Sequence, residues 1–189
     1  MRLSEPRIPP IQDGEFTDEQ RAALGDMAAK GPVLNIFRTL AHAPKALARF
    51  LPWGAYVLSR RNALSARERE IVILRTGFLC KSGYEFAQHS EMGRAAGLTD
   101  DEIAAVKHGA AAPVWSPSDA VLIRACDELH RDQFVGGATW ADLERHFDRK
   151  QCMDVVLTVG QYTQVSMLLN SFGVQLEEGQ TLDPDLKGF

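Results

Sequence analysis

A chain of 189 residues with 45% apolar residues and a net charge of -4 fits one globular domain with a sizeable buried core. Its 21 basic residues are scattered and form no basic stripe, which excludes nucleic acid as an expected partner. No apolar run approaches the ~20 residues that cross a bilayer, and the first ten residues lack the apolar segment of a signal peptide. We therefore expect a cytoplasmic protein that is not inserted in a membrane.

The chain is expected to begin with an extended arm followed by a helix. Residues 1–16 contain three prolines, a composition typical of an arm rather than a regular element. Thr17 and Gln20 then have the spacing of a capping box, in which each residue satisfies a backbone N–H at the helix start. The helix that they open is expected to end before Gly31, which is followed by proline.

An aromatic-rich stretch follows and offers weak candidates for substrate binding. Pro44 and Pro52 are expected to divide it into short helices, because neither proline fits deep inside a helix. Phe37 could roof a pocket, although aromatic residues at such spacing more often belong to a core. Arg38 and His42 are four residues apart and could either supply a cation for a substrate carboxylate or form a surface pair.

The next helix carries a charge where an apolar residue belongs. Ser65 and Glu68 form a second capping box, and the helix is then apolar nearly all round. A helix of this composition is buried in a core. At ~100° per residue, Glu70 falls in the same sector as Ile73 and Leu74 and is expected to point inward.

A short turn leads to a second helix with two more titratable groups on its packing face. Glu85 and His89 are four residues apart, which places their Cβ atoms roughly 6 Å from each other on one side of a helix. Burial of an ionised carboxylate costs several kcal/mol unless the group is paired. Glu70, Glu85 and His89 are therefore expected to converge on one another or on a substrate. The alternative is a structural network that fixes the angle between the two helices.

Start and stop signals in the rest of the chain predict further helices and no strand. Thr99, Ser116 and Thr139 each begin a helix, and a long helix runs from about Arg149 to a stop at Gly173. The pattern as a whole predicts an all-α helical bundle of about eight helices.

The chain is expected to divide into three parts. The arm covers residues 1–16, a single helical domain covers 17–175, and a polar tail covers 176–189. The tail is punctuated by glycine and proline, so it is expected to be mobile or to wrap around another subunit.

The spacing of the site residues resembles that of a known superfamily. From Glu70 through Ser82 and Glu85 to His89 it reads E-x11-S-x2-E-x3-H. This is similar to the carboxymuconolactone decarboxylase and alkyl hydroperoxidase D-like superfamily, whose peroxidase branch has E-x11-C-x2-C-x3-H. The string YEFAQH, which begins at Tyr84, looks like the YEWxxH variant of the decarboxylase-like branch.

This resemblance extends over most of residues 33–170 and implies both a fold and an activity. The fold would be a helical bundle of the alkyl hydroperoxidase D-like type, assembled as a homo-oligomer such as a dimer, trimer or hexamer. The activity would be cofactor-free proton transfer on a small carboxylate or lactone. His89 would act as general acid or base, and Glu70 or Glu85 would orient it or carry the second proton. Ser82 and Tyr84 are weak candidates for substrate binding.

A second interpretation is a peroxidase that uses Cys80 with a proton relay through Glu70 and His89. Ser82 and Glu85 replace the paired cysteines, so the dithiol mechanism does not carry over. Cys80 is expected at a helix C-terminus, where the helix dipole disfavours a thiolate, and is therefore expected to be buried and inert. The three cysteines are widely separated, which indicates reduced thiols rather than disulfides.

Two further interpretations stay open at this point. Glu70, Glu85 and His89 are an adequate ligand set for a divalent metal, although the favoured interpretation uses neither metal nor cofactor. The chain could also be a non-catalytic oligomer that uses the same scaffold to bind partners.

Overall fold

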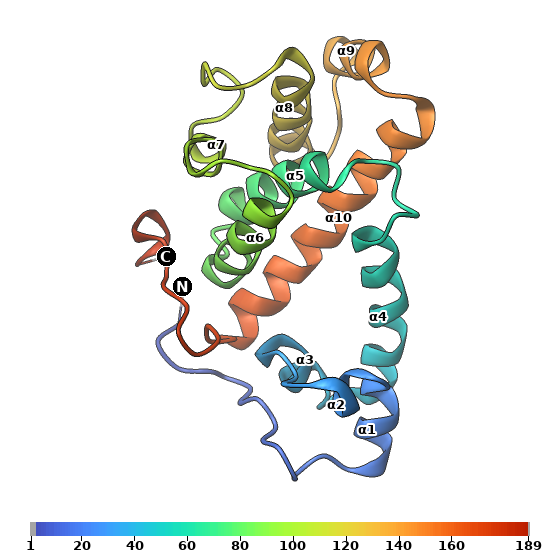
Figure 1. Ribbon diagram of the computed structural model, residues 1–189, viewed down its shortest axis with the longest axis vertical. Helices are drawn as coiled ribbons and strands as arrows, with labels where there is room; N and C mark the ends of the chain where they lie inside the picture. The colour runs from blue at the N-terminus through green and yellow to red at the C-terminus, as the bar shows by residue number, and fades with distance from the viewer. Residues whose placement is uncertain (1–2, 189) are drawn as a thin grey trace.

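Two buried helices, α5 (Ala66–Leu79) and α10 (Arg149–Phe172), cross at the centre of the structure. The computed structural model describes residues 3–188, and over this range the chain forms helices and no strand (Figure 1). The predicted all-α bundle is thereby confirmed. The other α-helices are α1 (Asp18–Leu24), α2 (Met27–Lys30), α3 (Asn35–Leu40), α4 (Pro44–Leu58), α6 (Gly83–Ala95), α7 (Asp100–Ala105), α8 (Pro117–Asp132) and α9 (Gly137–His146).

Helix α5 lies at the centre of the core because it carries buried apolar residues on all sides. Val72, Ile73 and Leu74 are fully buried, and each belongs to a different hydrophobic cluster. Its start is fixed by the predicted capping box, in which the Ser65 side chain accepts a hydrogen bond from the Glu68 N–H. Helices α6, α8 and α10 pack around it. Helix α5, which carries Glu70, therefore lies beside α6, which carries Glu85 and His89.

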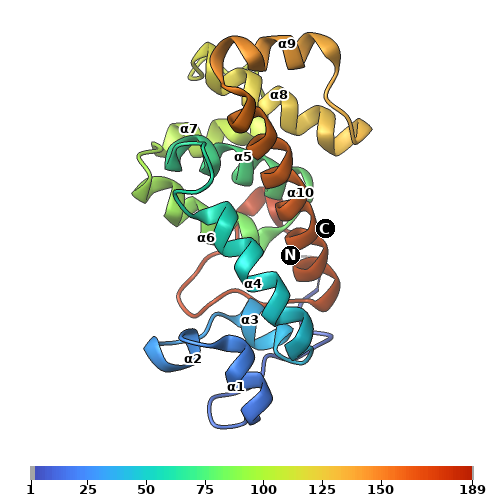
Figure 2. The same cartoon turned by 90° about the vertical axis from the view of Figure 1, so that its right-hand side faces the viewer.

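The helices form two end groups with a central group between them. Helices α1 to α4 gather at one end and α8 and α9 at the other, with α5 and α6 between them and α10 running along the molecule (Figures 1 and 2). The two chain ends lie close together near α10 in both views. Over residues 3–188, no helix has the length and apolar character that crossing a bilayer demands.

The prediction that Pro52 separates two helices is wrong. Helix α4 begins with Pro44 as expected but continues through Pro52 to Leu58. A proline inside a helix leaves the carbonyl four residues earlier without its hydrogen bond. Here that carbonyl belongs to Ala48, and both Ala48 and Pro52 are exposed, so water can satisfy the group.

The arm and the tail both pack on the helices of their own chain. The N–H groups of Arg7 and Ile8 donate hydrogen bonds to the Phe172 carbonyl at the end of α10, at 2.9 and 3.2 Å. In the tail, Leu186 is 1% exposed, and Lys107 forms ion pairs with Asp183 and Asp185. The tail was expected to be mobile or to wrap around another subunit, and here its residues 183–186 pack on their own chain.

The contact between the arm and the end of α10 gives a first prediction. Gly173 has φ +71, and a Cβ there would lie 2.9 Å from the Glu5 carbonyl oxygen, whereas Gly179 has φ +84 with no atom within 4 Å. Gly173→Ala should lower the free energy of unfolding by about 2–3 kcal/mol, from backbone strain and overpacking together. Gly179→Ala carries the backbone strain alone and should cost about 1 kcal/mol. Urea unfolding followed by circular dichroism measures both, and equal losses would contradict a rigidly packed arm.

Candidate active site

A buried histidine lies between two buried glutamates where α5 packs on α6. The Nδ1 atom of His89 is 2.6 Å from Oε2 of Glu70, and its Nε2 atom is 2.9 Å from Oε1 of Glu85. The three residues are 6%, 2% and 3% exposed, respectively. The helical spacing of four brings Glu85 next to His89, and Glu70 reaches them from the neighbouring helix. The three groups that we expected to converge thus lie in direct contact.

Small residues allow α5 and α6 to come close enough for this contact. A Cβ at Gly77 on α5 would lie 3.2 Å from Cγ of Glu85. A Cβ at Gly93 on α6 would lie 3.0 Å from a methyl carbon of Leu98 and 3.8 Å from Cβ of Glu70. Larger residues at either position would push the helices apart and separate the glutamates from the imidazole.

The two carboxylates keep the His89 imidazole protonated. Burial alone would lower its pKa, because an apolar surrounding disfavours the charged ring. The charge of Glu85 and the hydrogen bond with Glu70 outweigh burial and raise the pKa of His89 to about 10. Burial also raises the pKa of Tyr162 well above its ordinary value, and its ring meets the His89 ring edge-on at a centroid distance of 5.0 Å. At neutral pH the site therefore holds an imidazolium beside a neutral phenol.

The site opens on a cavity of about 390 Å³ between α3, α4, α6 and α10. Its walls are mostly apolar or aromatic, and its polar side chains include Glu85, Gln88, His89 and Gln161. A cavity of this size fits a small organic molecule. Leu34, Leu58 and Met92 line it and are each more than a third exposed, so apolar side chains also surround its opening.

Two buried polar atoms that belong to cavity-lining residues have no hydrogen-bond partner among the described residues. One is Oε1 of Glu85, which lies at ion-pair distance from His89 but is not aligned for a hydrogen bond. The other is Oε1 of Gln161, on a side chain that is 4% exposed. Buried polar atoms in proteins nearly always have partners, so Oε1 of Gln161 is available to a ligand, whereas Oε1 of Glu85 keeps its 2.9 Å contact with the His89 ring.

The weaker candidates from the sequence fall into two groups. Phe37 and Tyr84 line the cavity, and the Tyr84 hydroxyl donates a 2.6 Å hydrogen bond to Glu177 in the tail. Arg38 instead faces the arm, where it donates to the Ile11 carbonyl and pairs with Asp13. Ser82 is fully buried at the start of α6 and is absent from the described cavity lining.

Gln161 and Glu177 were missed by sequence reasoning. Gln161 interrupts the apolar pattern of α10, and this interruption was the only signal that it faces a cavity rather than the core. Glu177 lies in the polar tail, and nothing in its local sequence indicates that it holds Tyr84.

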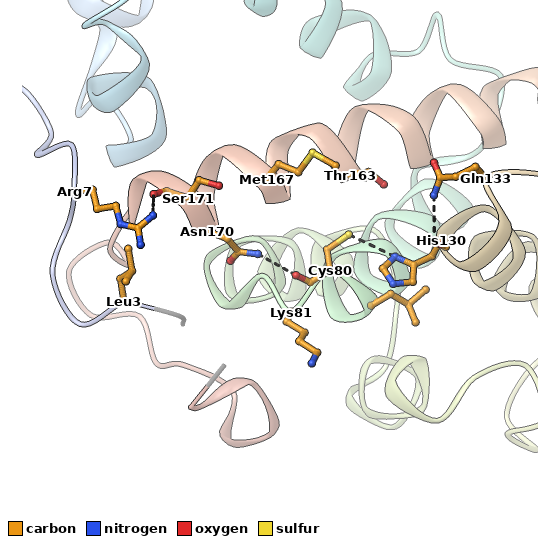
Figure 3. Close-up of a pocket in the computed structure, with 11 residues that line it drawn as sticks. Leu3, Arg7, Cys80, Lys81, His130, Gln133, Thr163, Met167, Asn170 and Ser171 are labelled. Carbon is orange, nitrogen blue, oxygen red and sulfur yellow. Dashed lines mark hydrogen bonds between the residues drawn. The ribbon is translucent and has the colours of Figure 1, made fainter.

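The prediction of a buried Cys80 is wrong. Cys80 follows α5 directly, is partly exposed, and its Sγ atom lies 3.9 Å from Nδ1 of His130 at the edge of a second cavity (Figure 3). Ten residues of helix separate Cys80 from Glu70, which corresponds to about 15 Å along α5. Cys126 and Cys152 are both fully buried.

The geometry does not suit a metal. Each ring nitrogen of His89 contacts a glutamate oxygen, at 2.6 and 2.9 Å, so neither nitrogen is directed at an open coordination position. Among the residues that the structure describes, no group of three or more His, Cys, Asp or Glu side chains has a metal-binding arrangement.

Comparison with known proteins finds a family model that matches the part of the chain that carries the cluster. Residues 44–128 match the model of the carboxymuconolactone decarboxylase family, a segment that runs from α4 into α8 and contains Glu70, Glu85 and His89. No curated protein matches the chain.

Solved structures with the same fold cover nearly the whole chain. An uncharacterized peroxidase-related protein from Ralstonia eutropha JMP134, an alkylhydroperoxidase AhpD core, is 19% identical with a TM-score of 0.79 over 92% of this chain and 93% of that one. A peroxidase-related protein from Silicibacter sp. TM1040 is 16% identical with a TM-score of 0.76 over 93% and 96%. The debrominase Bmp8, in a cysteine-to-alanine variant bound to 2,3,4-tribromopyrrole, is 8% identical with a TM-score of 0.76 over 93% and 94%. At these identities the likeness shows a shared fold.

The charge state of His89 gives a second prediction. In Glu70→Gln the ring loses the carboxylate that accepts its Nδ1 proton, so the pKa of His89 should fall below its value of about 10. The folded-state pKa lies above the ordinary 6.5, so the ion cluster stabilises the fold fully below pH 6.5 and loses this effect as the pH rises toward 10. The free energy of unfolding should therefore decrease across that window, and less steeply in Glu70→Gln.

Nuclear magnetic resonance of the His89 ring, with urea unfolding at several pH values, measures both effects. Glu91→Gln is the control: it changes an exposed carboxylate on α6, the helix that carries His89, and should leave the pKa of His89 unchanged. A wild-type His89 that titrates near 6.5 would contradict the cluster.

Proposed function

We propose that this chain, a member of the carboxymuconolactone decarboxylase and alkyl hydroperoxidase D-like superfamily, is a cofactor-free enzyme that moves a proton on a small uncharged carbonyl compound such as a lactone. The observation that carries the proposal is the Glu70–His89–Glu85 cluster at the wall of an apolar cavity. Perturbed titratable groups in a cavity with a few convergent polar atoms are typical of enzyme active sites.

Each residue of the cluster has a distinct role in this proposal. Glu85 is the base, since it lines the cavity and one of its oxygens has no aligned donor among the described residues. It takes a proton from the carbon next to the substrate carbonyl and later returns it to another atom of the same molecule. His89, oriented by Glu70, stays protonated and places a positive charge 2.9 Å from an oxygen of Glu85. The reaction needs no electron carrier.

Gln161 is proposed to bind the substrate carbonyl. Its carboxamide lies in the cavity wall, and an amide N–H there can donate to the oxygen on which negative charge develops. Its own Oε1 atom can accept a hydrogen bond from a ligand hydroxyl. The apolar walls then fix the rest of the molecule by shape.

The charges favour an uncharged lactone over a carboxylate. None of the described residues that line the cavity is a lysine or an arginine, and Arg38 is engaged with the arm. The imidazolium of His89 is already paired with two carboxylates. A substrate carboxylate would therefore enter an apolar cavity beside Glu85 without a cation of its own, which costs several kcal/mol.

The separation of Cys80 from this cluster disfavours a peroxidase in which Glu70 and His89 relay protons to a thiol. Cys80 lines the second cavity, and His130 rather than His89 is next to it. Proton relay requires hydrogen-bond contact or one bridging water, which about 15 Å along α5 does not allow. The homo-oligomeric state stays a prediction.

Replacement of the cluster residues gives a third prediction. With β,γ-unsaturated γ-lactones as substrates, Glu85→Gln and His89→Asn should each lower kcat by at least about a hundredfold, because the first removes the base and the second removes the positive charge next to it. Isomerisation, or exchange of the acidic protons in deuterated water, is followed by proton nuclear magnetic resonance at matched folded concentration. Turnover of carboxylated lactones but not of neutral ones by the wild type would overturn the proposed substrate class.

Gln161 gives a fourth prediction, with a control on the same helix. Gln161→Leu removes the carbonyl donor and should lower kcat/KM by about tenfold, whereas Gln164→Leu changes an exposed residue of α10 and should leave it unchanged. Steady-state kinetics on the same lactones compares kcat/KM of the two variants with that of the wild type. Equal values for Gln161→Leu and wild type would remove Gln161 from the site.

A further inference from the structure

A second cavity lies on the opposite side of α10 from the proposed active site. It measures about 590 Å³ and is formed by the arm, the end of α5, the end of α8 and α10 (Figure 3). Gln161 and Val165 of α10 line the first cavity, whereas Thr163, Met167 and Asn170 line the second. At ~100° per residue these two sets fall on opposite faces of the helix.

The second cavity brings a thiol and an imidazole together. The Sγ atom of Cys80 lies 3.9 Å from Nδ1 of His130, and Figure 3 shows the two side chains pointing toward each other. The Asn170 amide donates a 2.9 Å hydrogen bond to the Cys80 carbonyl, which fixes the backbone that carries the thiol. An imidazole in contact with a thiol can accept its proton and produce the nucleophilic thiolate.

The charged side chains that line this second cavity are positive. Arg7 from the arm and Lys81, which follows Cys80, line the cavity together with His130, and the described lining contains no Asp or Glu. Positive charges favour a thiolate and attract anionic ligands.

We propose that this second cavity binds an anionic low-molecular-weight thiol and holds it as a mixed disulfide with Cys80. The reactant is the symmetric disulfide of that thiol. His130 takes the Cys80 proton, and the thiolate attacks one sulfur of the disulfide. A new sulfur–sulfur bond forms as the old one breaks, the leaving thiolate takes the proton, and Cys80 is oxidised while the released thiol is reduced. This proposal does not depend on the lactone reaction at His89.

Three disulfide probes of different charge test the proposal on the intact protein. Oxidised glutathione is anionic, bis(2-hydroxyethyl) disulfide is neutral, and cystamine is cationic. The rate of adduct formation at Cys80, followed by mass spectrometry of the folded chain, should be about tenfold higher for glutathione than for cystamine at low salt. The preference should shrink at high salt. Cys126 and Cys152 are fully buried and should stay unmodified.

Matched variants assign the effect to individual residues. Cys80→Ser should abolish the adduct, and His130→Asn should slow it by about tenfold because the proton acceptor is lost. Lys81→Gln should slow the reaction with glutathione by about threefold, whereas Lys45→Gln, an exposed lysine on α4, should not. Circular dichroism checks that each variant is folded. Equal rates for the three probes, or an unchanged rate in His130→Asn, would overturn the proposal.

Discussion

The ion cluster of Glu70, His89 and Glu85 is the interaction on which the rest of the structure depends. It places an imidazole and two carboxyl groups in direct contact inside the packing of α5 against α6. Removal of one partner from a buried charged group typically costs about 3–5 kcal/mol, because the remaining charge is left uncompensated. The packing of α5 against α6 therefore cannot shift far without breaking a contact at the imidazole.

The rest of α5 is held in a way that protects this cluster. Arg67 at its start pairs with Asp119 on α8 and Glu102 on α7, and Arg75 pairs with Asp127 on α8. These ion pairs lie at the edge of the core and hold α5 against α7 and α8. On the other side, apolar residues of α5 pack against α10. The helix that carries Glu70 is thus held by ion pairs to α7 and α8 and by apolar packing against α10.

The sequence allowed the cluster to be predicted, because its signal is local. Glu70, Glu85 and His89 stand on faces that their neighbours mark as buried, and helical periodicity alone is enough to see this. The contact of Cys80 with His130 could not be predicted in the same way, because fifty residues separate the two in the chain. Arg38 was misleading for the same reason, since its partners lie in an arm whose path depends on tertiary packing. Pro52 shows that a proline does not end a helix where the carbonyl that loses its hydrogen bond is exposed to solvent.

Helix α10 separates two environments that suit different chemistry. On one face the walls are mostly apolar, the charged groups contact one another, and Gln161 has a buried oxygen without a partner among the described residues, which favours proton transfer on an uncharged molecule. On the other face a thiol lines a cavity whose charged side chains are positive, which favours reaction with an anion. A thiolate near Glu85 would be disfavoured by the carboxylates, and a lactone near Arg7 and Lys81 would lack apolar contacts. Ser82 and Glu85 fit this division: the thiol of Cys80 lies outside the cluster, and the cluster itself holds acid–base groups.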